Sequence, residues 1–281
     1  MKQEDVNQIL NIIESSKDTS IRERKEVYQK KAFDSDSVEV LKQMSFFRGN
    51  LYGWYPFKKD GKVLIVGAEC GYLTDFFSDK VDKVVVFEED PVMFDICRKR
   101  NEDRENVSFL SREEIFSEEI KESFDYIICD HGLEKFGKEL LTLLKILKTK
   151  DTIVFLSGAN RLGMKYWNGS KSEGQTRVFE GFEQEYGQRQ KRLYSRKEYV
   201  NLIQASSLCK EVVVYYPYPD EVFPIEVFSD LRLPKVGELN KSLRDFSPEK
   251  TELFQESEAF DVVIKEEEFP TFSNGFLFVL Q

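Results

Sequence analysis

Residues 63–71 read Val63-Leu64-Ile65-Val66-Gly67-Ala68-Glu69-Cys70-Gly71, an apolar run followed by a turn with glycine at both ends. A short, continuously apolar run is typical of a strand buried on both faces of a parallel sheet. A glycine turn between such a strand and a helix lets the backbone approach a nucleotide-like ligand closely. The stretch therefore predicts a strand, a ligand-binding loop and a helix, which is the first step of an α/β fold.

Predicted strands and helices alternate along the rest of the sequence. We expect helical structure from residue 1 to about 45, and Ser195 to Glu198 form a capping box that opens a later helix. The further segments are expected as strands at 62–66, 83–87, 107–110, 124–129, 152–156, 211–216 and 275–280, and as helices at 72–78, 91–100, 138–147 and 195–206. This order predicts a mostly parallel sheet with helices on both faces.

Changes in the alternation of strands and helices divide the chain into four predicted parts. Residues 1–57 form a helical and aromatic extension, and residues 58–157 form the Rossmann-like core that holds the loop. Residues 158–210 are expected as a lid insertion followed by a helix, because so long a connection is uncommon inside a compact domain. Residues 211–281 supply the last strands and a long insertion between them.

The composition excludes several classes of protein. The chain has 281 residues, a formal net charge of −10 and a pI near 5.0, which argues against binding to nucleic acid backbones. Its four cysteines are scattered, so no metal site is expected. The polar beginning is unlike a signal peptide, and no run approaches the roughly 18 apolar residues of a membrane span. We therefore expect a cytoplasmic protein without a membrane span.

The glycine spacing separates two classes of cofactor. A dinucleotide fold of the G-x-G-x-x-G type needs glycine at 67, 69 and 72, where this chain has Gly67, Glu69 and Tyr72. A nicotinamide dehydrogenase is therefore disfavoured. The spacing from Gly67 to Gly71 instead matches the loop pattern that binds S-adenosylmethionine.

Carboxylates follow the next strand. Lys83 to Phe87 ends in Glu88-Glu89-Asp90-Pro91, about 20 residues after the glycine loop. A carboxylate at this strand end accepts hydrogen bonds from both ribose hydroxyls of a nucleoside, and Glu88 is placed for that role. Glu89 or Asp90 is expected as the cap of the following helix, and the alternative is that all three are solvated surface acids.

With these motifs the chain resembles class I S-adenosylmethionine-dependent methyltransferases, in particular a bacterial group associated with cell-envelope glycan biosynthesis. The resemblance covers nearly the whole chain and is most specific in its later motifs. The motifs that carry it are Arg48 to Phe57, the glycine loop, Lys99 to Arg104, Phe124 to Tyr126, Asn160 to Trp167, Phe179 to Gly181, Tyr194 to Arg196, Tyr215 to Asp220, Phe228 to Asp230 and Phe272 to Asn274.

The resemblance implies a seven-stranded methyltransferase sheet with its last strand antiparallel. It implies S-adenosylmethionine as the cofactor, lying across the carboxyl ends of strands one, two and four, and a small-molecule or glycan acceptor. The cofactor-binding residues are then expected in the loop, at the carboxylates, beside the adenine and at the lip of the pocket, namely Gly67, Ala68, Glu69, Gly71, Glu88, Glu89, Ser111, Arg112 and Asp130. No oligomeric state follows from the sequence.

Three departures from the family pattern leave a second hypothesis open. One is that the segment Ser170 to Thr176 lacks the histidine and acidic pair that relatives show before Phe179, and the other two lie in the first strand and its loop. Glu69 replaces the middle glycine of the loop, and Ile65 replaces an acidic residue on the first strand. The Glu69 carboxylate would repel the carboxylate of the cofactor, although it would attract the sulfonium or the amino group. The alternative to an enzyme is therefore a catalytically inactive, methyltransferase-like binding or scaffolding protein.

His131 and Tyr166 are the candidate catalytic residues. His131 is the single histidine and follows the fourth strand, where a general base would assist methyl transfer to a hydroxyl. Tyr166, with Trp167, would line an acceptor pocket. The alternatives are a loop histidine without a catalytic task and aromatic side chains that anchor a lid.

Overall fold

The computed structural model describes residues 1–281 except 118–122, 172–177, 180–181, 183–191 and 240–251. The chain folds as two units, Met1–Ile120 and Lys121–Gln281. Much of the lid expected over 158–192, and part of the insertion expected before the last strand, therefore lie outside the described residues.

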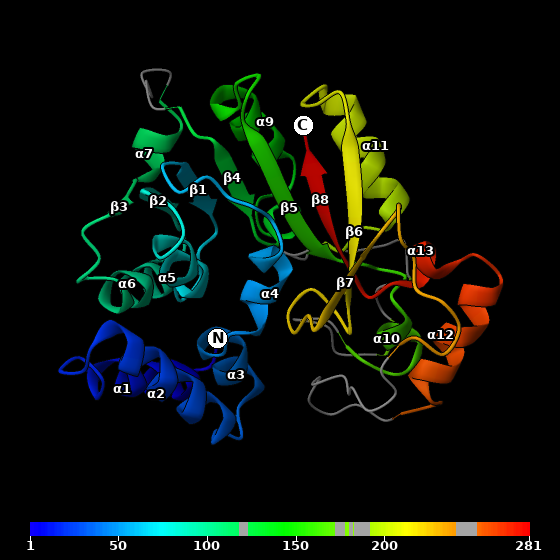
Figure 1. Ribbon diagram of the computed structural model, residues 1–281, viewed down its shortest axis with the longest axis horizontal. Helices are drawn as coiled ribbons and strands as arrows, with labels where there is room; N and C mark the ends of the chain where they lie inside the picture. Colours follow the sequence, from blue (N-terminus) through cyan, green and yellow to red (C-terminus); the bar gives the residue numbers. More distant parts are fainter. Residues whose placement is uncertain (118–122, 172–177, 180–181, 183–191, 240–251) are drawn as a thin grey trace. The chain divides into compact units, whose positions relative to one another are not determined.

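The first unit begins with four helices and continues with the predicted alternation (Figure 1). Its elements are α1 (Gln3–Glu14), α2 (Ile21–Phe33), α3 (Val38–Met44), α4 (Phe47–Gly53), β1 (Lys62–Val66), α5 (Tyr72–Ser78), β2 (Lys83–Phe87), α6 (Pro91–Arg100), β3 (Val107–Phe109) and α7 (Arg112–Ile115). Strands β1 and β2 and helices α5 and α6 have the predicted bounds, and α1, α2 and α3 confirm the helical structure expected from residue 1 to about 45.

The strands of this unit pair in parallel in the order β3-β2-β1. Val63 to Val66 of β1 are wholly buried, as their continuous apolar run predicts, and Val63 lies beside Val84 of β2. Helix α5 packs against β1 and β2, and α1 contacts α6. Parallel pairing brings the ends of β1 and β2 together, so the glycine loop and the carboxylates after β2 become neighbours.

The second unit also follows an alternating order and ends in antiparallel strands. Its elements are β4 (Tyr126–Cys129), α8 (Gly132–Phe136), α9 (Lys138–Leu147), β5 (Ile153–Ala159), α10 (Met164–Trp167), α11 (Arg196–Ser206), β6 (Val212–Tyr218), β7 (Glu226–Ser229), α12 (Glu256–Lys265), α13 (Phe269–Phe272) and β8 (Gly275–Leu280). The predicted capping box of α11 is present, because Ser195 Oγ accepts from Glu198 N and the Glu198 carboxylate accepts from Ser195 N.

Strand β8 is the centre of this unit. It pairs antiparallel with β5 on one side and with β6 on the other, and all six of its residues are buried. The antiparallel last strand is therefore confirmed. Tyr199 of α11 lies over it, with its ring centroid 5.0 Å from that of Phe278.

The described residues contain eight strands, one more than the seven expected. The additional strand, β7, has only four residues and pairs antiparallel with β6 inside the predicted insertion. Its side chains are only partly buried apart from Phe228, so it has no continuous apolar run that would predict it. Among the described residues, no helix is long and apolar enough to cross a membrane.

Candidate functional site

The loop after β1 has a backbone that its glycines make possible. Gly67 and Gly71 both have φ of +80°, and Gly71 precedes the first residue of α5. A Cβ at Gly71 would lie 2.7 Å from Asn101 Nδ2 and 2.8 Å from Cys97 Sγ, so a larger residue would not fit. The loop is thus a tight left-handed turn against α6, with a backbone free of side chains at both ends.

Glu69 occupies the middle of this loop and is the residue that departs from the expected pattern. Its φ is +50°, a conformation that is uncommon for a residue with a side chain. The side chain is buried, and one carboxylate oxygen accepts from Arg48 Nη1 at 2.7 Å and from Gln43 Nε2 at 2.8 Å. Lys42 Nζ lies 3.5 Å from the other oxygen. The carboxylate is therefore held by α3 and α4 and does not turn to solvent.

The pairing with Glu69 also determines the state of Arg48. Burial alone would lower the pKa of Arg48, but the charge of Glu69 and its hydrogen bond outweigh burial and raise it. Both groups are thus charged in the interior, where each needs the other.

Glu88 lies at the end of β2 and is oriented by backbone amides. One carboxylate oxygen accepts from Glu69 N at 2.7 Å, and the other accepts from Asp90 N at 2.9 Å. These bonds, one to each oxygen, fix the orientation of the carboxylate. The loop and the end of β2 thereby present one positioned carboxylate.

The other residues predicted in the first unit have local roles. Asp90 is the cap of α6, accepting from Val92 N and Met93 N, as one of the two expected alternatives. Glu89 is exposed and forms an ion pair with Arg112. Ser111 caps α7 in a capping box with Glu114. None of these contacts tests a role beside the adenine, which stays a prediction.

In the second unit, Asp130 and His131 follow β4 as expected. His131 has φ of +52° and precedes α8. Its amide donates to Ser157 Oγ at 3.2 Å, and that hydroxyl donates to Asp130 Oδ1 at 2.7 Å. Bonds between the ends of β4 and β5 thus hold the histidine backbone in its left-handed conformation.

The His131 ring is paired with a buried carboxylate. Nδ1 lies 3.1 Å from Glu134 Oε2, and the other Glu134 oxygen accepts from Ala159 N at 2.6 Å and Tyr199 Oη at 3.1 Å. Burial would raise the pKa of Glu134, but the adjacent His131 and these hydrogen bonds outweigh burial and lower the pKa. Because an ionised carboxylate only accepts, Nδ1 is the donor, and Nε2 of a neutral ring keeps its lone pair.

A second buried carboxylate faces the other ring nitrogen. Glu221 Oε1 lies 3.9 Å from His131 Nε2 and 3.9 Å from Lys165 Nζ, and Lys165 Nζ is 3.1 Å from Asp220 Oδ2. A Cβ at Gly275 would lie 2.0 Å from Glu221 Oε2, so glycine provides the room that this carboxylate occupies. Burial, the dominant cause, raises the pKa of Glu221. His131, Glu134, Lys165, Asp220 and Glu221 are named here the histidine cluster.

The motifs that carry the family resemblance meet around this cluster. Asn160 Nδ2 donates to the carbonyls of Thr271 and Ser273, and Asn274 Oδ1 accepts from Lys165 N at 2.7 Å. Asn274 Nδ2 donates to Pro219 O at 2.9 Å. Side-chain amides thus join three separate segments of the sequence, and these segments place Lys165 and Glu221 near His131.

Tyr166, the other candidate catalytic residue, packs in an apolar cluster with Ala159 and Leu193. Burial raises its pKa well above the ordinary range of tyrosine. Trp167 is 42% exposed, with its ring centroid 4.3 Å from that of Phe182. These contacts fit the anchoring alternative and leave a catalytic role of Tyr166 untested.

Sequence reasoning did not identify Glu134, Lys165, Tyr199 or Glu221 as site residues. Glu134 could have been identified from its spacing, because it lies three residues after His131, on the same helical turn. Lys165 lay inside a recognised motif, but nothing in its spacing indicated burial.

Comparison with models of protein families and with curated proteins finds no match to the chain. Among solved structures, it is similar to a SAM-dependent methyltransferase from Archaeoglobus fulgidus, with 13% identity, a TM-score of 0.50 and coverage of 87% of this chain and 94% of that one. It is also similar to a chain of a complex that contains the Haloferax volcanii Trm112 methyltransferase activator, with 12% identity, a TM-score of 0.52 and coverage of 93% and 96%. The chain therefore has the α/β, Rossmann-like methyltransferase fold, as predicted.

The pairing of Glu69 with Arg48 predicts a clear pattern of stabilities. We expect Glu69→Gly to lower the free energy of unfolding by about 3 kcal/mol, because the buried Arg48 charge loses its main partner. We expect the double variant Glu69→Gly with Arg48→Met to recover much of that loss. Urea unfolding of the wild type, both single variants and the double variant measures the coupling. Additive losses would contradict the pairing.

The raised pKa of Glu221 predicts how stability depends on pH. A carboxyl group with a raised folded pKa contributes stability that is complete below its unfolded pKa, about 4.3, and is lost as the pH rises through the folded pKa. Because the side chain of glutamine resembles a protonated carboxyl group, we expect Glu221→Gln to become more stable than the wild type between pH 5 and 8, by an amount that grows with pH. Because the pKa of Glu134 is lowered, Glu134 adds no dependence of stability on pH above pH 5. Urea unfolding across this range, with exposed Glu211→Gln as the control, tests the expectation; an unchanged slope would contradict it.

Proposed function

We propose that this protein binds S-adenosylmethionine and transfers its methyl group to a hydroxyl of a small-molecule or glycan acceptor. The observation that carries the proposal is the Glu88 carboxylate, which two backbone amides hold at the end of β2 beside the glycine loop. A carboxylate so placed suits the two ribose hydroxyls of a nucleoside. In a methyltransferase fold, the ligand expected at this loop is the cofactor S-adenosylmethionine.

The position of Glu69 is compatible with cofactor binding. Its carboxylate is neutralised by Arg48 and hydrogen-bonded by Gln43, so it contributes less repulsion toward a cofactor carboxylate than a free glutamate would. Ile65 is fully buried in β1, where it pairs in register with Val86 of β2. Both of these departures from the family pattern are therefore compatible with a bound cofactor.

The histidine cluster supports a proton-transfer role for His131. In methyl transfer to a hydroxyl, the acceptor oxygen forms a bond to the methyl carbon while the carbon–sulfur bond breaks and its electron pair stays on sulfur. The hydroxyl proton must leave, and His131 Nε2 has the lone pair that would accept it. Glu134, bonded to Nδ1, would stabilise the imidazolium that results.

The second candidate function is a methyltransferase-shaped binding protein without activity. The ion pair of Glu69 with Arg48 is the observation that favours it, because Arg48 is then already engaged by a carboxylate of the chain itself. The two functions differ in whether the natural protein binds S-adenosylmethionine and transfers its methyl group.

Calorimetry of the full chain with S-adenosylmethionine and S-adenosylhomocysteine tests cofactor binding. We expect both to bind, and we expect Glu88→Ala to weaken both by at least about ten-fold, since a charge-assisted hydrogen bond contributes about 1.5–3 kcal/mol. Glu105→Ala, an exposed carboxylate elsewhere in this unit, is the matched control. Absence of binding at near-millimolar ligand would reject the proposal. If Glu69→Gly then creates binding, the inactive alternative is correct.

Transfer of a tritiated methyl group from S-adenosylmethionine to a panel of mono- and oligosaccharides tests the role of His131. We expect His131→Gln to slow transfer about 100-fold or more, as loss of a general base does, with unchanged affinity for S-adenosylhomocysteine. The wild-type rate should rise with pH along a limb that the variant lacks. Lys138→Gln, an exposed neighbour, is the control. A variant with the wild-type rate and pH profile would leave His131 without a catalytic task.

A further inference from the structure

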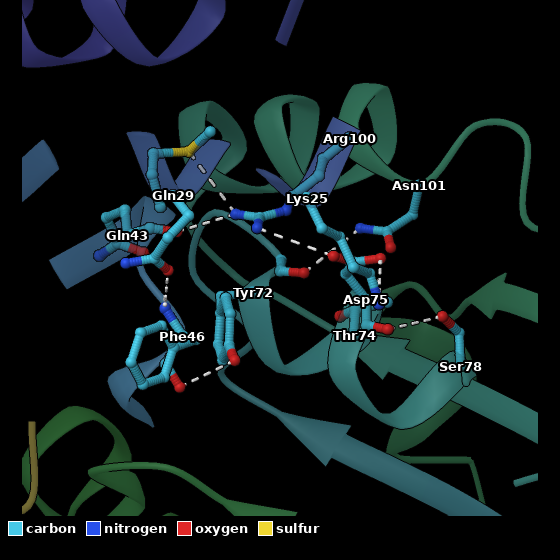
Figure 2. A network of polar contacts seen from close by, with 12 residues as sticks. Lys25, Gln29, Gln43, Phe46, Tyr72, Thr74, Asp75, Ser78, Arg100 and Asn101 are labelled. Carbon is cyan, nitrogen blue, oxygen red and sulfur yellow. Dashed lines mark hydrogen bonds and ion pairs between the residues drawn. The ribbon is translucent and has the colours of Figure 1, made fainter. Parts of the chain in front are cut away.

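A cavity in the first unit lies outside every residue assigned to the glycine loop. It has a volume of about 340 Å³ and is lined by α2, by residues on either side of the turn between α3 and α4, and by α5 and Arg100 of α6. This volume is within the range of small-molecule sites, which begins at about 300 Å³. Figure 2 shows the polar side chains around it, with Arg100, Tyr72 and Phe46 contributed by three different parts of the chain.

The unpartnered polar atoms of the cavity residues are hydrogen-bond donors. Among the described residues, Tyr28 Oη, Gln29 Nε2 and Arg100 Nε are buried and have no hydrogen-bond partner. All three residues line the cavity, and Tyr28 is only 2% exposed. An amide nitrogen and a guanidinium nitrogen only donate, and a tyrosine hydroxyl also donates. Buried donors left without acceptors are costly, so this arrangement favours a ligand that supplies acceptor oxygens.

The charged residues around the cavity also favour a ligand with acceptor oxygens. Lys25, Lys80 and Arg100 line it together with two aspartates, Asp75 and Asp79. Both aspartates are already paired with Arg104, which does not line the cavity: Arg104 Nη1 lies 2.6 Å from Asp79 Oδ1, and Nη2 contacts Asp75. Lys25 also contacts Asp79 and lies 3.7 Å from Asp75 Oδ1, and Arg100 Nη2 lies 3.8 Å from Asp75 Oδ2. Lys25, Lys80, Arg100 and Arg104 thus outnumber the two aspartates, and this excess of positive charge favours an anionic ligand.

The walls of the cavity are aromatic. Phe46, Tyr72 and Phe76 are incompletely buried and line it. The Arg100 guanidinium lies 4.9 Å from the Tyr28 ring centroid and 5.5 Å from that of Tyr72, so it is held between two rings. Tyr72 is fixed in turn, because its hydroxyl donates to Phe46 O at 2.9 Å (Figure 2). Rings with fixed positions offer faces on which a planar ligand stacks.

From these observations we infer that the cavity between α2, α5 and α6 is a second ligand site, separate from the cofactor loop, for an aromatic anion. The planar ring stacks against Phe46, Tyr72 and Phe76, and the carboxylate or phosphate accepts from Tyr28 Oη, Gln29 Nε2 and Arg100 Nε. An aromatic carboxylate and a pyrimidine nucleoside phosphate share this chemistry.

Calorimetry of the full chain with four probes tests the site. The probes are 4-hydroxybenzoate, uridine 5′-monophosphate, uridine and inorganic phosphate. We expect at least one of the two aromatic anions to bind ten-fold or more tightly than both uridine and phosphate, and which one binds identifies the source of the anion. Equal affinity for all four probes, or no binding by any, would overturn the inference.

Tyr28→Phe and Lys80→Gln locate the site. Tyr28→Phe removes one unpartnered hydroxyl and keeps the ring, so we expect a fold at least as stable as the wild type with binding of the aromatic anion five-fold or more weaker. Lys80→Gln removes a cation that lies over the Phe76 ring, and we expect a similar loss. Lys30→Gln on the exposed face of α2 and Glu88→Ala at the cofactor loop should leave binding unchanged. Binding that Glu88→Ala abolishes, or that Tyr28→Phe and Lys80→Gln leave intact, would place the anion elsewhere.

Discussion

A carboxylate buried in a protein has to be paired, and the first unit is arranged around such a group, that of Glu69. Arg48 and Gln43 bind it directly, and these two residues come from α4 and α3. Removing one partner of a buried ion pair costs about 3–5 kcal/mol, which is a large part of the stability of a domain. The pair therefore fixes the helical extension on the glycine loop. It also holds Glu69 at a positive φ that the backbone alone would disfavour.

The second unit meets the same constraint with more groups. Glu134, Asp220 and Glu221 are all buried, and Lys165 and His131 are the basic side chains that face them. Glu134 is fully hydrogen-bonded and has a lowered pKa, whereas Glu221 lies 3.9 Å from both His131 and Lys165 and has a raised pKa. Two neighbouring carboxyl groups whose pKa values move apart are a recurring property of sites that transfer protons. The asymmetry around His131 is thus more informative than the histidine itself.

Local sequence predicted the elements that depend on local interactions. Seven elements agree with the expected bounds, because apolar runs define the strands and Asp90 and Ser195 cap two of the helices. These elements are β1, β2, α5, α6, α9, α11 and β8. Glu88 was placed correctly at the end of β2 for the same reason. The short edge strand β7 was missed, since its pairing with β6 depends on the tertiary fold. The contacts that determine the candidate sites could not be predicted in this way, because Arg48 reaches Glu69 from an earlier helix and Asn160 and Asn274 join distant segments around Lys165.

Gln43 connects the two sites of the first unit. Its backbone carbonyl accepts from Arg100 Nη1 at 2.8 Å, and its side chain donates to Glu69 Oε2 at 2.8 Å. Arg100 lines the cavity and Glu69 lies in the glycine loop, so one residue has bonds to both. Since Arg100 is also held between Tyr28 and Tyr72, an anion bound at its Nε meets a guanidinium whose position is already fixed. Donors with fixed positions lose little conformational freedom on binding, and this is the physical reason why the cavity suits a specific ligand.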